Sequence, residues 1–176
     1  GVVVGLALDE DGIPDTTEGR LAIAEKIYQT GEKYGISRKD IVIDALVMTM
    51  STNNESAKIT LDTVKEITAR GGKTVLGVSN ISFGLPERVF VNTAFLTLAI
   101  GQGLTMAIAN PSQTLLVNAA LASDLLLNKE EADLHYINGV AGAVVTQSQP
   151  KNEVAEEDGH PLYLAVVKGK SGHVLE

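Results

Sequence analysis

The chain has 176 residues, of which 44% are hydrophobic and 20% are charged, a composition typical of a soluble globular protein with a substantial core. Its formal net charge of −8, without any run of lysine or arginine, disfavours contact with a phosphate backbone, so nucleic acid is not an expected partner. The sequence contains no cysteine, which excludes disulfides, thiolate metal sites and thiol nucleophiles within it, and we expect a cytoplasmic protein.

The longest uncharged span, residues 89–123, is the one segment that raises the question of a membrane. Asn92, Gln102, Asn110 and Pro111 interrupt it, so no apolar stretch of the ~20 residues needed to cross a bilayer remains. The first residues carry no charged leader and no cleavage-site pattern, which indicates a strand and not a secretion signal. We therefore expect no membrane association.

The first predicted unit is a strand over residues 2–8 followed by a helix. The strand is apolar on both faces, as expected for a parallel strand that helices cover. Asp15 is a suitable N-cap for the helix, Glu18 would complete a capping box, and Gly35 is a suitable stop. The helix has a buried stripe at helical spacing: Leu21, Ala24, Ile27 and Tyr28.

The second and third units follow the same pattern. An apolar strand over residues 41–47 precedes a helix over 56–70, which ends at two glycines. A strand over 74–80 then leads to a helix that we expect Pro86 to open, because its missing N–H costs nothing in the first turn. The apolar positions of these two helices are Ile59, Leu61, Val64 and Ile67, and Val89, Phe90, Phe95, Leu96 and Leu98.

The fourth unit has a strand over residues 105–110 and a helix for which Asn110 is the expected cap and Pro111 the first residue. After residue 128 the pattern changes: residues 129–150 predict one further helix, and 151–176 a polar linker that begins a following segment. The predicted inner face of the fourth helix consists of Leu115, Leu116, Ala119, Ala122, Leu125 and Leu126.

The order strand, helix, repeated through residues 1–128, predicts an α/β fold with a parallel sheet. Two architectures fit it: a small doubly wound sheet, or half of a (β/α)8 barrel, which needs ~250 residues when complete. Both place their chemistry at the carboxyl ends of the strands. We therefore look for functional side chains there.

Two polar residues at strand ends are the leading candidates. Asp44 lies inside "IVIDALV", where an ionised carboxylate without partners is costly; it is either a binding group or a structural carboxylate paired with a backbone amide or an arginine. A carboxylate accepts two parallel hydrogen bonds, which suits the edge of a pterin or guanine ring. Asn80 ends the third strand, where an asparagine is either a turn former or a side chain held out toward a ligand.

Other motifs carry little chemistry. Residues 9–12 resemble part of a calcium loop but lack its remaining ligands, and the glycines form no nucleotide-binding pattern after a strand. Asp133, His135 and Gly139 resemble the cobalt-binding motif Asp-x-His-x-x-Gly but are out of step by one residue, so we interpret His135 as an ordinary helix residue. We expect no metal site.

The strings "TVLGVSNISFGLPERVFVNTAFLTLAIGQGLTMAIANP", "GLALDEDGIPDTTEGRLAIA" and "IVIDALV" resemble the pterin-binding domain of corrinoid-dependent methyltetrahydrofolate methyltransferases. This group includes the folate domain of cobalamin-dependent methionine synthase and the methyltransferase that serves the corrinoid iron–sulfur protein. The resemblance covers residues 1–128. It implies a TIM barrel of the dihydropteroate-synthase type, of which this chain supplies the C-terminal half, strands five to eight.

The resemblance also implies roles for individual residues. The family's pterin-binding aspartate falls on Asp44, and its asparagine beside the methyl-bearing nitrogen falls on Asn80, which is thereby the expected catalytic residue. An amide can donate or accept a hydrogen bond during the transfer, whereas a carboxylate only accepts. Arg88 is expected to contact the glutamate tail of folate. The other substrate-binding candidates at this rim are Ser79, Ser82 and Asn110.

The implied activity is transfer of the methyl group of 5-methyltetrahydrofolate to cob(I)alamin or another corrinoid that a partner protein or domain carries. The family's other pterin ligands lie on strands that this chain lacks, so we expect the N-terminal half of the barrel, and a homo-oligomer, as partners. One alternative is a dihydropteroate-synthase-like enzyme, which Ser79-Asn80-Ile81 disfavours because that family has Ser-Arg-Lys there. The other is a non-catalytic folate-binding half-barrel.

Overall fold

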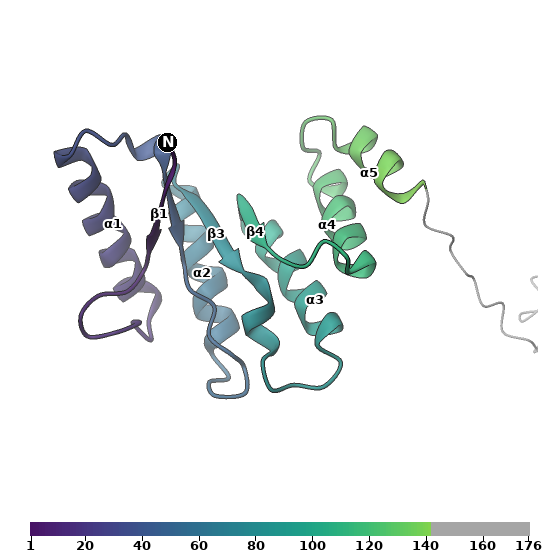
Figure 1. Ribbon diagram of the computed structural model, residues 1–176, viewed down its shortest axis with the longest axis horizontal. Coiled ribbons are helices and arrows are strands. Elements are labelled where there is room, and N and C mark those ends of the chain that lie inside the picture. Colours follow the sequence, from purple (N-terminus) through teal and green to yellow (C-terminus); the bar gives the residue numbers. More distant parts are fainter. Residues whose placement is uncertain (142–176) are drawn as a thin grey trace, which may run out of the picture. The chain divides into compact units, whose positions relative to one another are not determined.

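The computed structural model describes residues 1–141, which form a four-stranded sheet and its helices (Figure 1). The α/β prediction is therefore confirmed, and the linker predicted over 151–176 lies outside the described residues. In chain order the elements are β1 (Val3–Leu6), α1 (Thr17–Lys33), η1 (Arg38–Asp40), β2 (Ile41–Asp44), α2 (Ser56–Ala69), β3 (Lys73–Gly77), η2 (Val78–Ser82), α3 (Arg88–Gly101), β4 (Met106–Ile108), α4 (Thr114–Leu126) and α5 (Ala132–Val140).

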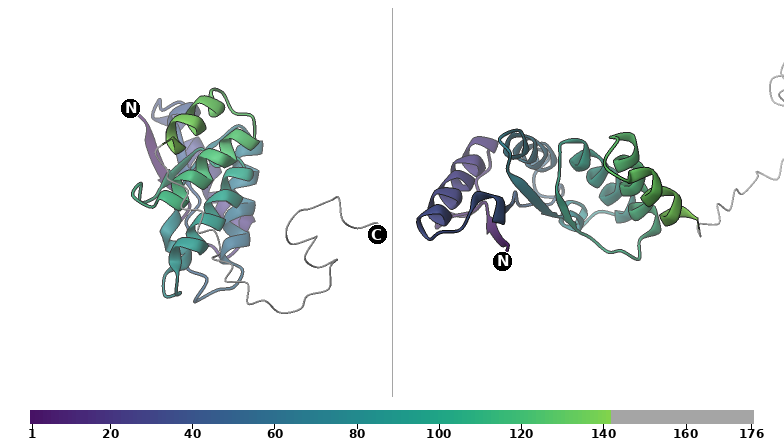
Figure 2. Two further views of the ribbon diagram at one scale, coloured as in Figure 1. Left: turned by 90° about the vertical axis from the view of Figure 1, so that its right-hand side faces the viewer. Right: turned by 90° about the horizontal axis from the view of Figure 1, so that it is seen from above.

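The strands are all parallel and lie in the order β1-β2-β3-β4, so each pairs with its neighbours in sequence. Right-handed crossovers between sequential parallel strands place the connecting helices on one face of the sheet, and α1, α2 and α3 lie there (Figures 1 and 2). A doubly wound sheet instead reverses its strand order at a switch point. Of the two predicted architectures, the observed order agrees with the barrel type.

Two apolar clusters join the sheet to its helices. In the first, Ile41 and Ile43 of β2 pack with Tyr28 of α1 and Ile67 of α2. The second surrounds Leu76 of β3 and is built from residues of α2, α3 and α4. Because successive strand side chains point to opposite faces, the residues between these positions face away from the helices.

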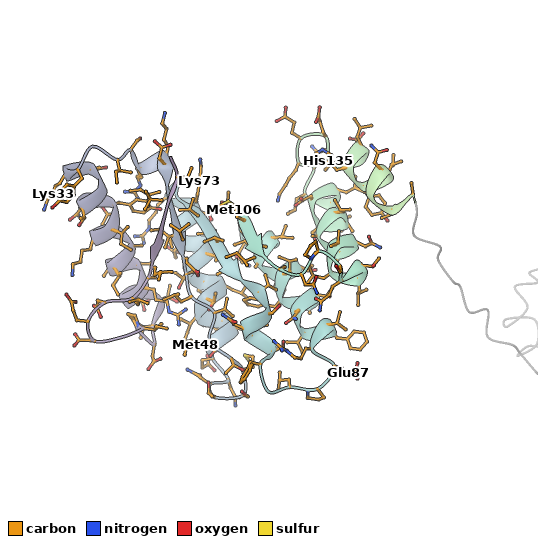
Figure 3. The ribbon with its side chains drawn as sticks, viewed as in Figure 1. Lys33, Met48, Lys73, Glu87, Met106 and His135 are labelled. Carbon is orange, nitrogen blue, oxygen red and sulfur yellow. The ribbon has the colours of Figure 1, made fainter. Side chains whose placement is uncertain are left out.

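We call the side of the sheet opposite α1, α2 and α3 the open face. Strand register aligns one row of side chains across it: Leu6, Asp44, Val75 and Met106. Figure 3 shows Met106 at the amino end of β4, with Met48 and Glu87 in the loops at the opposite, carboxyl end of the sheet. The row therefore runs from one edge strand to the other, with Asp44 as its polar member.

The two edge strands are more exposed than the sequence predicts. We expected helices to cover all four strands on both faces, but α1, α2 and α3 cover only one face of the sheet (Figures 1 and 2). The central strands β2 and β3 are nevertheless largely buried. In β1 and β4, by contrast, Val4 is 51% exposed and Ile108 is 66% exposed. Apolar side chains at a free sheet edge indicate a surface that a further structural element would cover.

The helix termini differ from the predictions in three places. The cap of α1 is Thr16, not Asp15, because the backbone of Thr16 is extended and its side chain accepts the N–H of Gly19 at 3.1 Å. The helix α3 begins at Arg88, two residues after Pro86. The helix α4 begins at Thr114 with Gln113 as its cap, not at Asn110 and Pro111. By contrast, α1 and α2 end near Gly35 and Gly71, as predicted, and both glycines have positive φ.

The predicted inner faces of α3 and α4 are also partly wrong. Phe90 and Leu98 are 60% and 56% exposed, and Leu126 is 85% exposed. The buried residues of α3 are instead Asn92, Phe95, Leu96, Ala99 and Ile100, and those of α4 are Leu116 and Ser123. Within residues 1–141, no helix has both the length and the apolar character required to cross a membrane.

Candidate functional site

Asp44 ends β2 on the open face. It is half-buried, and its Oδ1 accepts the backbone N–H of Leu46 at 2.9 Å. Burial raises the pKa of the Asp44 carboxyl because it disfavours the charged form, and the hydrogen bond from Leu46 acts in the opposite direction. The carboxylate thus has one fixed donor from the chain and unused acceptor capacity for a ligand.

Asn80 lies in η2, directly after β3, and its side chain is exposed. Its Nδ2 is 3.4 Å from the position that a Cβ on Gly77 would occupy. Gly77 is two residues beyond Val75 in β3, so both face the same side as Asp44. Asp44, the last residue of β2, and Asn80, just after the adjacent β3, therefore lie at the same edge of the sheet and reach the same open face.

Ser79, Ser82 and Arg88 form a hydrogen-bonded group at the junction of η2 and α3. Arg88 donates from Nη2 to the backbone oxygen of Ser79 at 2.7 Å and from Nε to Oγ of Ser82 at 2.9 Å. The Ser82 hydroxyl in turn donates to the backbone oxygen of Ser79 at 3.3 Å. Arg88 thus stabilises the turn that carries Asn80. The expected contact between Arg88 and the glutamate tail of folate remains a prediction.

Asn110 lies apart from this group. It follows β4 at the carboxyl edge of the sheet, but its Oδ1 accepts the N–H of Ser112 at 2.9 Å. This closes a local turn, the ordinary use of asparagine after a strand. Its role in substrate binding remains a prediction.

Arg20 of α1 is a residue that the sequence analysis missed. Its side chain is 1% exposed and contacts the segment that follows Asp44, at the backbone oxygens of Ala45 and Leu46. The signal was present in the sequence, because Arg20 lies four residues before Ala24 on the buried stripe of the helix. A charged residue on such a stripe is costly unless it binds something specific.

A cavity of about 570 Å³ lies elsewhere, beside β1 and α1. Its lining includes Val3, Ile23, Ile27 and Tyr34, and none of the predicted site residues. This cavity, a groove between β1 and α1, is largely apolar and adjoins the free edge of β1. These properties are typical of a surface that packs against another structural element. The open face is different, since it combines apolar strand residues with a carboxylate and an amide. Within the described part of the chain, no group of His, Asp or Glu has the arrangement of a metal site.

Comparison with known proteins identifies the family. The model of the family described as "Pterin binding enzyme" matches residues 12–110, more than half of the chain. The matched segment includes both Asp44 and Asn80.

Three named relatives are similar to most of this chain. The methylcorrinoid:tetrahydrofolate methyltransferase of Eubacterium limosum is 33% identical over 131 residues, which cover 73% of this chain and 48% of the relative. Methionine synthase of Mycobacterium tuberculosis is 31% identical over 180 residues, covering 92% of this chain and 15% of that protein. Methionine synthase of Mycobacterium leprae is 35% identical over 125 residues, covering 66% of this chain and 10% of that protein.

The chain thus spans about half the length of the first of these relatives and a small part of the two methionine synthases. The family match, the parallel sheet with sequential strands and the polar groups at its carboxyl edge agree with one another. The chain belongs to the family of pterin-binding enzymes.

Proposed function

We propose that the chain supplies part of the pterin site of a methyltransferase that moves a methyl group between a tetrahydrofolate nitrogen and a corrinoid. The observation that carries the proposal is the position of Asp44 and Asn80 on one open face, after adjacent strands. A reduced pterin presents adjacent N–H donors along one edge, which a carboxylate can accept, and a reacting nitrogen, which a neutral amide can hydrogen-bond. The family match and the names of the relatives agree with this chemistry.

Asp44 is the group that orients the ring. Its carboxylate can accept two parallel hydrogen bonds from the ring N–H and the exocyclic amino group of a pterin. The bond from Leu46 leaves that capacity available and fixes the direction of the carboxylate. The contribution of Asp44 is binding and alignment of the substrate and not proton transfer.

Asn80 is the group at the reacting nitrogen. When bound by its partner domain or protein, the corrinoid supplies the nucleophile that accepts the methyl carbon while the C–N electron pair stays on nitrogen. That nitrogen then needs a proton or a strong hydrogen bond. The Asn80 amide cannot supply a proton at neutral pH, but it can hydrogen-bond the nitrogen or hold a water molecule that relays the proton from solvent. Because the amide has both an NH2 group and a carbonyl oxygen, it can donate or accept at different stages.

The same site serves both directions of transfer. The name of the Eubacterium limosum relative joins a methylcorrinoid with tetrahydrofolate, whereas we predict transfer from methyltetrahydrofolate to the corrinoid. Forward and reverse reactions share one transition state, so an interaction that stabilises it accelerates both. The roles of Asp44 and Asn80 are therefore independent of the direction.

We further propose that the chain corresponds to strands five to eight of a barrel and that the N-terminal half completes the site. The exposed apolar residues of β1 and β4, and the groove beside β1, would be covered by that half. A homo-oligomer and a corrinoid protein are the further proposed partners. The dihydropteroate-synthase alternative is not favoured, because Asn80 and Ile81 stand where a leaving pyrophosphate would need cationic side chains.

The substitution Asn80→Ala tests the proposal in the completed enzyme. We expect methyl transfer to cob(I)alamin to slow by roughly 10² to 10³, the usual effect of removing one donor that acts in the transition state. Stopped-flow absorbance of the corrinoid measures the rate. Asn54→Ala, in the exposed loop before α2, is the matched control and should leave the rate unchanged. Equal rates for Asn80→Ala and wild type would remove Asn80 from the mechanism.

A further inference from the structure

Arg20 connects three segments around the end of β2. Its Nε donates to the backbone oxygen of Pro14 at 2.9 Å, in the loop before α1. Its Nη1 donates to the backbone oxygens of Ala45 at 2.8 Å and Leu46 at 2.7 Å, and contacts Oγ1 of Thr60 in α2 at 3.2 Å. The guanidinium is thus held mainly by backbone carbonyls, and two of these directly follow Asp44.

Leu46, whose backbone oxygen accepts one of these hydrogen bonds, has an unusual backbone conformation. Its φ is +61°, in the left-handed region where a residue with a Cβ is crowded. The Leu46 oxygen accepts from Arg20 and also from the Thr60 hydroxyl at 3.1 Å. Its N–H meanwhile donates to Asp44. Arg20 and Thr60 therefore hold the carbonyl of this strained residue, while its N–H orients the Asp44 carboxylate.

We propose that Arg20, together with Thr60, is a positioning residue for the pterin site: the two side chains hold Leu46 in the conformation whose N–H orients the Asp44 carboxylate on the open face. The functional meaning of this assignment rests on the proposed role of Asp44. The structural claim, that Arg20 and Thr60 orient the Asp44 carboxylate through Leu46, rests only on the contacts among these four residues.

A purely structural role for Arg20 makes a different prediction. If Arg20 only held the loops together, its loss would lower stability without changing the environment of the Asp44 carboxyl in the molecules that remain folded. If it positions Asp44, its loss releases the Leu46 N–H. A carboxylate that loses a hydrogen-bond donor becomes harder to ionise. The titration of Asp44 in the folded protein therefore separates the two roles.

The test is a carbon-13 NMR titration of the full chain with labelled aspartate side chains, in which Asp44→Asn identifies the Asp44 signal. In Arg20→Lys and in Thr60→Val, we expect the midpoint of the Asp44 titration to move to higher pH. We also expect the Leu46 amide proton to exchange about tenfold faster, the factor for loss of one hydrogen bond. Thr60→Val decides the question if Arg20→Lys does not fold.

Thr63→Val is the matched control. Thr63 is buried in the same helix and its hydroxyl donates to the backbone oxygen of Ile59, away from the Asp44 segment. It should leave the Asp44 midpoint unchanged. An unchanged midpoint in folded Arg20→Lys or Thr60→Val, or an equal change in Thr63→Val, would overturn the proposal.

A rescue variant tests whether the backbone conformation is the link. Glycine adopts positive φ without crowding, so Leu46→Gly in the Arg20→Lys background should move the Asp44 midpoint back toward the wild-type value. No return toward that value would contradict the proposed link. None of these readouts includes a folate. If the Asp44 titration responds as predicted but the enzyme completed with the N-terminal half binds no pterin, the proposed function is refuted and the positioning of Asp44 stands.

Discussion

At the scale of single residues, Asp44 combines a cost in stability with a capacity for binding. Burial raises its pKa, so between the ordinary pKa of aspartate and the raised native value the folded chain holds more protons than the unfolded chain. The stabilising contribution of the protonated form is complete below the ordinary value and is lost as the pH rises through the native pKa. At neutral pH the ionised Asp44 therefore destabilises the unliganded fold.

The substitution Asp44→Asn should consequently raise the melting temperature of the chain at pH 7 while it weakens pterin binding in the completed enzyme. Asparagine keeps an acceptor for the Leu46 N–H but carries no charge. The gain in stability should disappear toward about pH 3, where aspartate is protonated in both states. Loss of the carboxylate should cost roughly 2 to 5 kcal/mol of binding free energy.

Thermal unfolding followed by circular dichroism at several pH values measures the first effect, and calorimetric titration of the folate measures the second. Asp11→Asn, in an exposed turn, is the control for removing one negative charge. A lower melting temperature for Asp44→Asn at pH 7, or an unchanged folate affinity, would contradict this account of Asp44.

Sequence reasoning selected Asp44 and Asn80 because Asp44 lies inside, and Asn80 at the end of, an apolar run that predicts a strand of a parallel sheet, and because the family resemblance assigned both a role. It missed Arg20 because the partners that link this side chain to Asp44, the backbone oxygens of Ala45 and Leu46, lie 25 and 26 positions away in the chain. It chose Asp15 over Thr16 because both residue types cap helices well, and only the backbone path decides which one does so.

At the scale of elements, the turn η2 and its connection to α3 determine where Asn80 lies. Arg88 closes this connection through Ser79 and Ser82. Arg88→Ala should lower the free energy of unfolding by about 1 to 2 kcal/mol, because one backbone carbonyl and one hydroxyl lose a charged donor. Urea unfolding measures the change.

Arg70→Ala is the control for this prediction. Arg70 makes a single exposed ion pair with Glu66 one turn away on α2, an interaction that contributes less than ~0.5 kcal/mol. If both variants lost the same stability, Arg88 would be an ordinary surface residue and the turn would not depend on it.

The elements themselves were predicted well where hydrophobic periodicity and glycine agree, as in α2, which begins at Ser56 as predicted and ends before Gly71. They were predicted poorly at Pro86 and Asn110, where the expected helix starts fall in loops. The Asn110 side chain binds the N–H of Ser112, and this local turn delays the helix by several residues. Sequence pattern does not distinguish a helix cap from such a turn, since the same side chain serves both.

At the scale of the whole molecule, the sequence left two architectures open, a doubly wound sheet and half of a barrel, and the strand order distinguishes between them. Periodicity predicts strands and helices, but pairing is a long-range property that the alternation of elements does not encode. The sequential order favours the barrel type, and the exposed β1 and β4 then become the edges where other strands would continue it.

The edge strand β4 offers a test of barrel completion. Ile108 is 66% exposed and aligns with Gly77 in the sheet, so in a completed barrel it would face the interior. Ile108→Lys should weaken association with the N-terminal half by at least tenfold, because a buried cation without a partner is costly. Sedimentation velocity measures the association, with Thr97→Lys on the exposed side of α3 as control. If the wild type, Ile108→Lys and Thr97→Lys all associated equally well with the N-terminal half, the interface would not include Ile108.

The most direct test of the proposed site is a nitrogen-15 NMR titration of the labelled chain, combined with the unlabelled N-terminal half, with methyltetrahydrofolate. We predict that the signals of the Asn80 side-chain amide and of the Leu46 backbone amide shift together, with one midpoint. Shifts confined instead to Ile23, Ile27 and their neighbours in the groove between β1 and α1, with Asn80 and Leu46 unmoved, would contradict it.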